Sequence, residues 1–264
     1  MNRAVLFFDI DGTILSENTR TVPESAVTAL KAAQAAGHLL FINTGRTVSS
    51  LPAEITRIGF DGYLCGCGTY LIFREQLIFS RSINEERGES IIRKAGECSV
   101  GCVAEGIEDV YFPERMTRFD DLEQSRRYFR NRGMGMEKPL ERGGFTFDKV
   151  FIYSDDRSDL DGFFSFVSED MDVIDRGGGA YEIVQKGYSK ATACEYILKK
   201  LDIPKERAYV FGDSGNDLPM FVYADHAIAM GKHADVLEPY TEFVTRTVED
   251  GGIAYALRHY GLIG

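Results

Sequence analysis

No stretch of this 264-residue sequence stays apolar for the ~20 residues that a membrane-spanning helix needs. The first residues also lack the charged, apolar and small-residue series that is typical of a signal peptide. We see neither an internal repeat nor a low-complexity tract. We therefore expect a cytoplasmic protein without a membrane partner.

The sequence has fewer basic than acidic residues. The sequence has 30 Lys and Arg residues against 41 Asp and Glu residues, and its formal net charge is −11. Such a balance argues against a nucleic acid or an anionic membrane as the main partner. It still permits an anionic substrate, provided that a bound cation and a few basic side chains neutralise the anion locally.

Cysteine is sparse and odd in number. The five cysteines are Cys65, Cys67, Cys98, Cys102 and Cys194. We interpret them as reduced thiols of a cytosolic protein. Cys65 and Cys67 invite a zinc interpretation, but no second Cys or His pair at zinc-finger spacing accompanies them. Small buried residues at a strand end are the favoured interpretation.

The apolar content of 44% is sufficient for a sizeable core. Both ends of the chain alternate short apolar runs with helical patterns, which predicts a doubly wound parallel α/β sheet of the Rossmann type. The predicted strands lie at 4–8, 39–42, 63–65, 208–211 and 227–229. The predicted helices begin near 23, 48, 191, 217 and 253, and residues 70–79 read as a hairpin.

The middle of the chain has a different character. Charged segments rich in Arg and Glu run from about residue 81 to 144, and shorter strand patterns follow at 145–153 and 181–184. We predict an inserted α+β domain at 81–184, and a core domain made of 1–80 and 185–264.

Polar residues follow several of the predicted core strands. Because ligands bind outside the carboxyl ends of the strands of an open α/β sheet, we expect these residues to converge. The groups are Asp9 and Asp11 after the first strand, Asn43-Thr44-Gly45-Arg46 after the second, Lys190 at a helix start, and Gly212-Asp213-Ser214-Gly215-Asn216-Asp217 after a late strand.

The chemistry of these groups is complementary. Two or three carboxylates suit a hard cation such as Mg²⁺. A hydroxyl, a lysine and the N–H groups of Gly-containing loops suit phosphate oxygens. A carboxylate nucleophile can form an aspartyl-phosphate, and phosphoryl transfer needs mainly positioning and charge neutralisation.

With these motifs the chain resembles the haloacid dehalogenase superfamily of phosphotransferases. The large insertion resembles the α+β cap of type IIB that the Cof-type subfamily carries, and the closing Glu249-Asp250-Gly251-Gly252-Ile253-Ala254 is similar to that subfamily's C-terminal pattern. The resemblance covers the whole chain, most securely at 1–70 and 180–256. It implies an Mg²⁺-dependent enzyme with an aspartyl-phosphate intermediate.

The resemblance also implies roles. Asp9 would be the nucleophile and a metal ligand. Asp11 would protonate the leaving oxygen and later activate water, with its backbone carbonyl on the metal. Thr44, Gly45 and Lys190 would hold the phosphoryl group, and Asp213 would complete the protein's share of the metal shell.

Asn216 and Asp217 would support phosphate and metal, and Arg46 would have a supporting role. Several of these positions have a structural alternative. Thr44 could cap the next helix. Lys186 rivals Lys190, although only Lys190 stands at a helix start, where an ammonium group needs a nearby anion. Asp217 could be a first-turn helix residue, and Arg46 could merely pair with a carboxylate at the domain boundary.

One stretch departs from the family pattern. Similar proteins usually carry Asn-Gly after the third strand, and here Cys67 occupies the Asn position. Any substrate contact that the amide makes in those proteins is therefore in doubt.

The leading hypothesis is a Mg²⁺-dependent phosphatase that hydrolyses a small phosphorylated metabolite, a sugar phosphate or similar. The alternatives are a phosphomutase of the same fold and a non-catalytic binding or regulatory protein. The sequence identifies neither the substrate nor the oligomeric state. Basic residues of the insertion are substrate candidates, among them Arg81, Arg87, Arg115, Arg118, Arg126 and Arg127.

Overall fold

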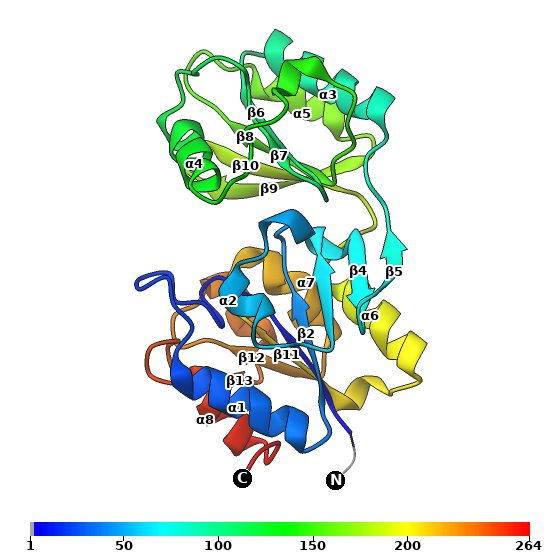
Figure 1. Ribbon diagram of the computed structural model, residues 1–264, viewed down its shortest axis with the longest axis vertical. Coiled ribbons are helices and arrows are strands. Elements are labelled where there is room, and N and C mark those ends of the chain that lie inside the picture. Colours follow the sequence, from blue (N-terminus) through cyan, green and yellow to red (C-terminus); the bar gives the residue numbers. More distant parts are fainter. Residues whose placement is uncertain (1–2) are drawn as a thin grey trace. The chain divides into compact units, whose positions relative to one another are not determined.

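The computed structural model describes residues 3–264. They form two compact units, which Figure 1 draws. The core unit consists of residues 3–46, 51–80 and 188–264, and the inserted unit consists of 47–50 and 81–187. The insertion predicted from the sequence spans 81–184, whereas the inserted unit runs to residue 187 and also includes the short segment at 47–50.

An eight-stranded sheet forms the centre of the core unit, in the order β13-β12-β11-β1-β2-β3-β4-β5. The strands from β13 to β3 run parallel, and β4 and β5 add the predicted hairpin at one edge. Their bounds are β1 Val5–Phe8, β2 Leu39–Asn43, β3 Gly62–Cys65, β4 Tyr70–Phe73, β5 Gln76–Ser80, β11 Ala208–Gly212, β12 His226–Ala229 and β13 Phe243–Val244.

Helices cover both faces of this sheet (Figure 1). On one face, α1 (Glu24–Ala35) and α8 (Gly252–His259) pack against Leu6 and Phe8. On the other, α6 (Lys190–Leu201) and α7 (Leu218–Tyr223) pack against Val5 and Phe7. Every residue of β1 is thus buried, which explains why the strand is a continuous apolar run rather than an alternating one. Each such side chain contributes about 1.5–3 kcal/mol by leaving water.

The order in which the chain adds strands to the sheet reverses at β1. From β1 the chain moves outward through β2 to β3 on one side, and β11, β12 and β13 extend the sheet on the other. The crevice at such a switch point, outside the carboxyl ends of the strands, is the usual ligand site of this architecture. The fold therefore directs attention to the residues that follow β1, β2 and β11.

The helix that is predicted to begin near residue 48 is interrupted. The segment forms a 3-10 turn at Val48–Ser50 and then the short helix α2 (Ala53–Thr56). Pro52 explains the break, because proline has no backbone N–H and disfavours a helical conformation in the residue before it. Pro52 instead precedes the first turn of α2 in an extended conformation.

The inserted unit is built on a five-stranded antiparallel sheet in the order β7-β6-β8-β10-β9. Helices α3 (Glu85–Glu97) and α5 (Leu160–Val167) pack on one face, and α4 (Asp120–Arg130) packs on Val103, Phe151 and Tyr153 of the other. The strands are β6 Gly101–Glu105, β7 Val110–Tyr111, β8 Lys149–Tyr153, β9 Met171–Gly177 and β10 Ala180–Gln185.

The α4 face of this sheet also carries four charged side chains, which we call the ionic quartet. Lys149 Nζ lies 2.7 Å from Glu182 Oε1 and 3.5 Å from Glu105 Oε2. Arg176 Nη2 lies 2.8 Å from the second oxygen of Glu182, which is fully buried. The two cations balance the two carboxylates, the condition under which buried charges are tolerated.

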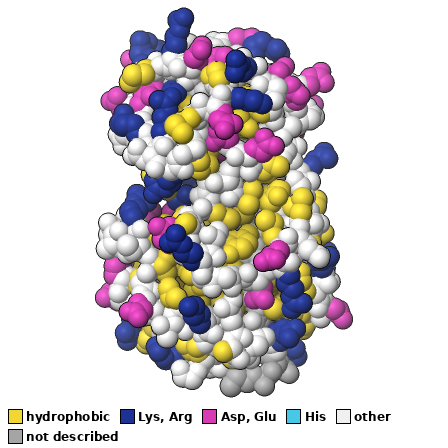
Figure 2. Space-filling model, in the orientation of Figure 1, with side chains coloured by type: hydrophobic (Ala, Val, Ile, Leu, Met, Phe, Trp, Pro, Cys, Tyr) yellow, Lys and Arg dark blue, Asp and Glu magenta, His cyan; other side chains and the backbone are white. Residues whose placement is uncertain are grey.

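The structure thus has the predicted fold class, a doubly wound α/β sheet with an inserted α+β unit. No helix within residues 3–264 is long and apolar enough to cross a membrane. On the face that Figure 2 draws, Lys and Arg side chains are interspersed with Asp and Glu rather than gathered into one basic track.

Candidate functional site

Asp9 continues β1 beyond its last apolar residue. Its backbone N–H donates to the Phe211 carbonyl at 3.0 Å, so the β1–β11 pairing extends to the carboxylate-bearing residue. Asp213 follows the end of β11 in the same way. Two adjacent buried strands therefore deliver Asp9 and Asp213 to the same edge of the sheet, as the sequence predicts.

Lys190 connects these strands to α6. Its ammonium group, which is fully buried, lies 2.7 Å from Asp9 Oδ1, 2.6 Å from Asp217 Oδ1 and 3.1 Å from Asn216 Oδ1. Burial by itself lowers the pKa of Lys190, but the charges of Asp217 and Asp9 outweigh it and hold the pKa above its usual value. The ammonium group therefore stays charged at the start of a helix because carboxylates surround it.

The start of α6 is held in place from two sides. Ser189 caps the helix through a capping box with Thr192. Asn43, at the end of β2, donates from Nδ2 to the Lys190 carbonyl at 2.9 Å. The sequence does not predict this role of Asn43, because a contact across 147 positions leaves no local signal.

Three carboxylates meet beside Lys190. Oxygens of Asp9, Asp213 and Asp217 lie within 4.8 Å of one another. Burial raises the pKa of Asp9 to about 7, against the opposing charge of Lys190 and with added repulsion from Asp217 and Asp11. Burial together with the charges of Asp9 and Asp217 raises the pKa of Asp213 to about 8. This oxygen-only donor set fits a hard divalent cation, which would relieve the repulsion.

Asp217 has a more structural position than Asp9 and Asp213. Its Oδ1 accepts from Lys190, and its Oδ2 accepts from the backbone N–H groups of Asp213 and Ser214 at 2.9 and 3.0 Å. Both carboxylate oxygens are thus engaged within the chain. Asp217 orients Lys190 and the loop that carries Asp213, which is more than a helix-dipole contact.

Asp11 points to a different partner. Arg46 donates to both of its carboxylate oxygens, from Nε at 2.6 Å and from Nη2 at 2.8 Å. Burial by itself would raise the pKa of Asp11, but the Arg46 fork outweighs burial and holds the pKa below its usual value. The carboxylate pairing considered for Arg46 is therefore present, and its partner is the predicted acid–base residue.

Thr44 and Gly45 lie at the end of β2 and are buried. The Thr44 N–H donates to the Leu64 carbonyl at 2.8 Å, and its Oγ1 accepts from the Arg46 N–H at 3.1 Å. No helix begins at Thr44, so the capping alternative does not apply; the next turn begins at Val48. The Thr44 hydroxyl remains able to donate its own proton.

Lys186, the rival of Lys190, lies elsewhere. It belongs to the inserted unit, where its Nζ donates to the Ser168 carbonyl. Lys190 is therefore the lysine that the fold brings to Asp9.

The loop after β1 contains two contributors that the sequence analysis quotes without a role. Thr13 Oγ1 donates to Asp213 Oδ1 at 2.9 Å. Gly12 has a φ of +78°, and a Cβ there would lie 2.3 Å from Asp213 Oδ2. Glycine is needed because the backbone approaches the Asp213 carboxylate too closely for any side chain.

The loop that carries Cys67 is tightly wound. Gly66, Cys67 and Gly68 all have positive φ, at 59°, 55° and 95°. Such a conformation suits Gly and Asn and costs other residues about 1–2 kcal/mol. A Cβ at Gly68 would lie 2.7 Å from the Ser189 carbonyl, so the loop packs closely on the start of α6. All five cysteines are outside disulfides.

The sequence profile of haloacid dehalogenase-like hydrolases matches residues 6–257. The chain belongs to this family. It is 25% identical over 271 residues to YkrA of Bacillus subtilis, with both chains fully covered. It is 24% identical to the 5-amino-6-(5-phospho-D-ribitylamino)uracil phosphatase YitU of the same organism, with 97% of each chain covered.

Solved structures share the fold. The sugar phosphatase BT4131, of subclass IIB of this superfamily, matches with a TM-score of 0.83 at 23% identity, over 98% of this chain and 100% of its own. Together with the family match, the named relatives identify the chain as an enzyme, a phosphatase acting on phosphorylated substrates.

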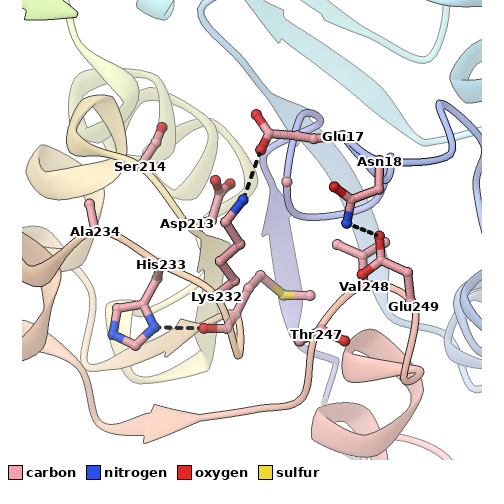
Figure 3. A pocket seen from close by; sticks show the side chains of 12 residues that line it. Glu17, Asn18, Asp213, Ser214, Lys232, His233, Ala234, Thr247, Val248 and Glu249 are labelled. Carbon is pink, nitrogen blue, oxygen red and sulfur yellow. Dashed lines mark hydrogen bonds and ion pairs between the residues drawn. The ribbon is translucent and has the colours of Figure 1, made fainter. Parts of the chain in front are cut away.

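A cavity of about 410 Å³ opens beside the carboxylate cluster of this hydrolase fold, within the core unit. Asp213, Gly12 and Ser214 line one side. Figure 3 shows Lys232 extending toward Glu17, with the charged groups 3.7 Å apart. The cavity is polar on the side of Asp213, so it offers room for water next to the candidate cation site.

We predict that Gly12→Ala disturbs the carboxylate cluster through this close approach. Cation affinity and kcat/KM for p-nitrophenyl phosphate should each fall about tenfold or more, because Asp213 must move. Gly37→Ala is the matched control: it has the same backbone strain, with a φ of +91°, but no atom within 4 Å of the added Cβ. Calorimetric titration with Mg²⁺ and steady-state kinetics measure both effects. Equal kcat/KM in the two variants would contradict the assigned role of Gly12.

Proposed function

We propose that this phosphatase is Mg²⁺-dependent, acts on a small phosphorylated metabolite and works through an aspartyl-phosphate formed on Asp9. The observation that carries the proposal is the buried arrangement of Asp9, 2.7 Å from Lys190 and within 4.8 Å of Asp213 and Asp217. It combines a nucleophile, a fixed cation and a set of oxygen ligands at one sheet edge.

Asp9 and Asp213 would hold the Mg²⁺ ion, with the Asp11 backbone carbonyl as a third ligand. These are fewer than the six ligands that Mg²⁺ prefers, and the ion commonly retains waters to complete its shell. The cavity beside Asp213 gives such waters room. When bound, the cation neutralises charge on the carboxylates and on the phosphoryl oxygens.

In the first half of the proposed reaction, an Asp9 oxygen attacks phosphorus while the ester P–O bond breaks. The leaving oxygen takes a proton from Asp11, and the Thr44 hydroxyl and Lys190 hold the phosphoryl oxygens. A carboxylic acid cannot accept a two-pronged ionic contact from a guanidinium group through both of its oxygens. Arg46 must therefore move away from Asp11 before Asp11 can act as the acid.

In the second half, water attacks the phosphorus of the acyl phosphate and gives its proton to Asp11. The bond between Asp9 and phosphorus breaks, which regenerates the Asp9 carboxylate and releases inorganic phosphate. The low pKa that Arg46 imposes on Asp11 suits this second role, because a base must begin deprotonated. Lys190 compensates the negative charge of Asp9 throughout.

A small polyhydroxylated ester is the substrate class that we favour. Two of the relatives act, by their names, on a ribityl phosphate and on sugar phosphates. The inserted unit would select among such esters. Product analysis with a hexose phosphate separates this proposal from the phosphomutase alternative, because only a phosphatase releases free phosphate.

We predict that Asp9→Asn lowers turnover of p-nitrophenyl phosphate by about 10³-fold or more, since the amide has no charge with which to attack. The variant should stay folded, because Asn occupies nearly the same volume. Asp156→Asn, which neutralises an exposed carboxylate in the inserted unit, is the control and should keep full activity. Near-normal turnover in a folded Asp9→Asn protein would contradict the role of Asp9 as the nucleophile.

We predict that Mg²⁺ affinity rises with pH between 6 and 8. Protons compete with the cation for Asp9 and Asp213, whose raised pKa values of about 7 and about 8 keep both carboxyls largely protonated at pH 6. Calorimetric titrations in two buffers of different ionisation enthalpy should show proton release at neutral pH. EDTA should abolish activity, and Mg²⁺ should restore it. A pH-independent affinity, or full activity after exhaustive chelation, would refute this metal role.

The six arginines first considered for substrate selection divide into two groups. Arg87, Arg118 and Arg126 are each paired with a carboxylate of the inserted unit, Asp170, Asp155 and Glu123 respectively. Their charges are thus largely committed to the fold. Arg81, Arg115 and Arg127 are exposed. The charges of the ionic quartet are paired as well, but its donors and acceptors lie together on one sheet face without surplus charge, and Arg176 is exposed. We therefore favour the quartet as the candidate that contacts substrate hydroxyl groups.

We predict that Arg176→Gln changes the ranking of substrates. It should lower kcat/KM for the best sugar-type phosphate at least tenfold, ~1.4 kcal/mol, and barely affect p-nitrophenyl phosphate. Lys149 still pairs with Glu182 in this variant, so the sheet should remain folded. Arg118→Gln, which breaks an exposed pair, is the control. If kcat/KM falls equally for both substrates, the quartet only supports the fold, and specificity must be sought in core loops such as 65–69.

A further inference from the structure

A second cavity lies wholly within the inserted unit. It measures about 180 Å³ and opens between the residues that follow β7 and the end of α4. Phe112 lines it, together with Gly135 and Met136 of the loop after α4. Gly135 of that loop has a φ of +70° and packs so closely that a Cβ would lie 2.7 Å from Phe112. Its N–H donates to Asp109 Oδ1 at 2.7 Å. Close packing and a hydrogen bond therefore hold the Gly135 side of the cavity in place.

Arg126 projects into this cavity from α4 although the residue is only 5% exposed. Its guanidinium lies 5.2 Å from the centre of the Phe112 ring. Nε and Nη2 donate to Glu123 and to the Arg115 carbonyl, and Nη1 donates to the Pro113 carbonyl. Four of its five N–H groups are thus engaged. The fifth, on Nη1, has no acceptor among residues 3–264.

Two more cations line the cavity without carboxylate partners. Within the described residues, no Asp or Glu oxygen lies within ion-pair distance of Arg130 or Lys138. Lys138 makes a single bond, to the Gly144 carbonyl at 3.3 Å. In a protein with a net charge of −11, the lining of this small cavity carries three cations against one carboxylate, that of Glu114, and only Arg126 of the three is paired with a carboxylate, Glu123. Neither the family chemistry nor the ionic quartet accounts for it.

We infer that this cavity binds a small oxyanion, a phosphate or phosphoryl group. Arg126 offers a preorganised N–H from a desolvated position, and Arg130 and Lys138 supply the charge that draws the anion in. Charge-assisted hydrogen bonds of this kind are about twice as strong as neutral ones. A water occupies roughly 30 Å³ of liquid, so the cavity has ample room for a tetrahedral oxyanion and bridging waters.

One lining residue opposes the anion. Glu114 also borders the cavity, and its backbone N–H donates to Glu141 Oε2 at 2.9 Å. Its negative charge weakens the field of Arg130 and Lys138. The site is therefore tuned for modest affinity, and removal of this charge should strengthen anion binding. A specific site predicts that removing Glu114 raises anion affinity whereas removing Arg130 and Lys138 lowers it. General attraction of anions to a basic surface does not require these particular residues.

The test is a titration of the full-length protein with inorganic phosphate, without added cation, followed through the amide of Gly135 and the Nε–H of Arg126 by heteronuclear NMR. Sodium chloride at matched ionic strength is the reference. The double variant Arg130→Gln/Lys138→Gln should weaken phosphate binding about tenfold or more. Arg127→Gln/Arg132→Gln removes the same charge from the same part of the chain without touching the cavity lining, and should leave the affinity nearly unchanged.

Glu114→Gln provides the test of opposite sign and should tighten binding several-fold. Titrating the Asp9→Asn protein with a hexose phosphate shows whether the site accepts the phosphoryl group of an intact ester as well as free phosphate; saturable binding of either supports the inference. Shifts that chloride reproduces, equal losses in the two double variants, or no gain in Glu114→Gln would overturn it. Because these readouts do not use catalysis, they stand or fall apart from the proposed reaction.

Discussion

The burial of one ammonium group among carboxylates is the constraint around which the core unit is arranged. Lys190 is fully buried, and it is tolerated only because Asp9, Asp217 and Asn216 complete its contacts. Removing both carboxylate partners would leave an uncompensated buried charge, which costs several kcal/mol. The same contacts join β1, α6 and the loop after β11. The charge balance that the chemistry needs is therefore also part of what holds these elements together.

The aspartates of the site have different roles, although they are residues of one type. Asp9 and Asp213 repel each other and have raised pKa values, so they are poised to accept a cation. Both carboxylate oxygens of Asp217 accept hydrogen bonds, one from Lys190 and the other from backbone N–H groups, so Asp217 fixes the position of Lys190 and of the loop after β11. Asp11 is held ionised by Arg46. Four aspartates thus have four environments, and burial and the nearest cation decide each.

The inserted unit handles charge differently. Its sheet face carries a neutral quartet, whereas the cavity beside α4 has surplus positive charge from Arg130 and Lys138. Balanced donors and acceptors suit hydroxyl groups, and unbalanced cations suit an oxyanion. Arginines that look equivalent in the sequence fall into distinct classes once their partners are seen. Arg126 combines two of them, because it is paired with Glu123 and also lines the cavity.

The sequence by itself determined the α/β class and the strand ends that carry the motifs, and it favoured Lys190 over Lys186. These features rest on local signals: apolar runs, turn residues and a helix start. Only the tertiary structure decided the partners. Thr13 meets Asp213 across 200 positions, Asn43 meets Lys190 across 147, and Arg46 from the loop after β2 meets Asp11 from the loop after β1. Such pairings depend on which strands lie side by side and on how closely backbones approach, as at Gly12, and these depend on the packing of the whole unit.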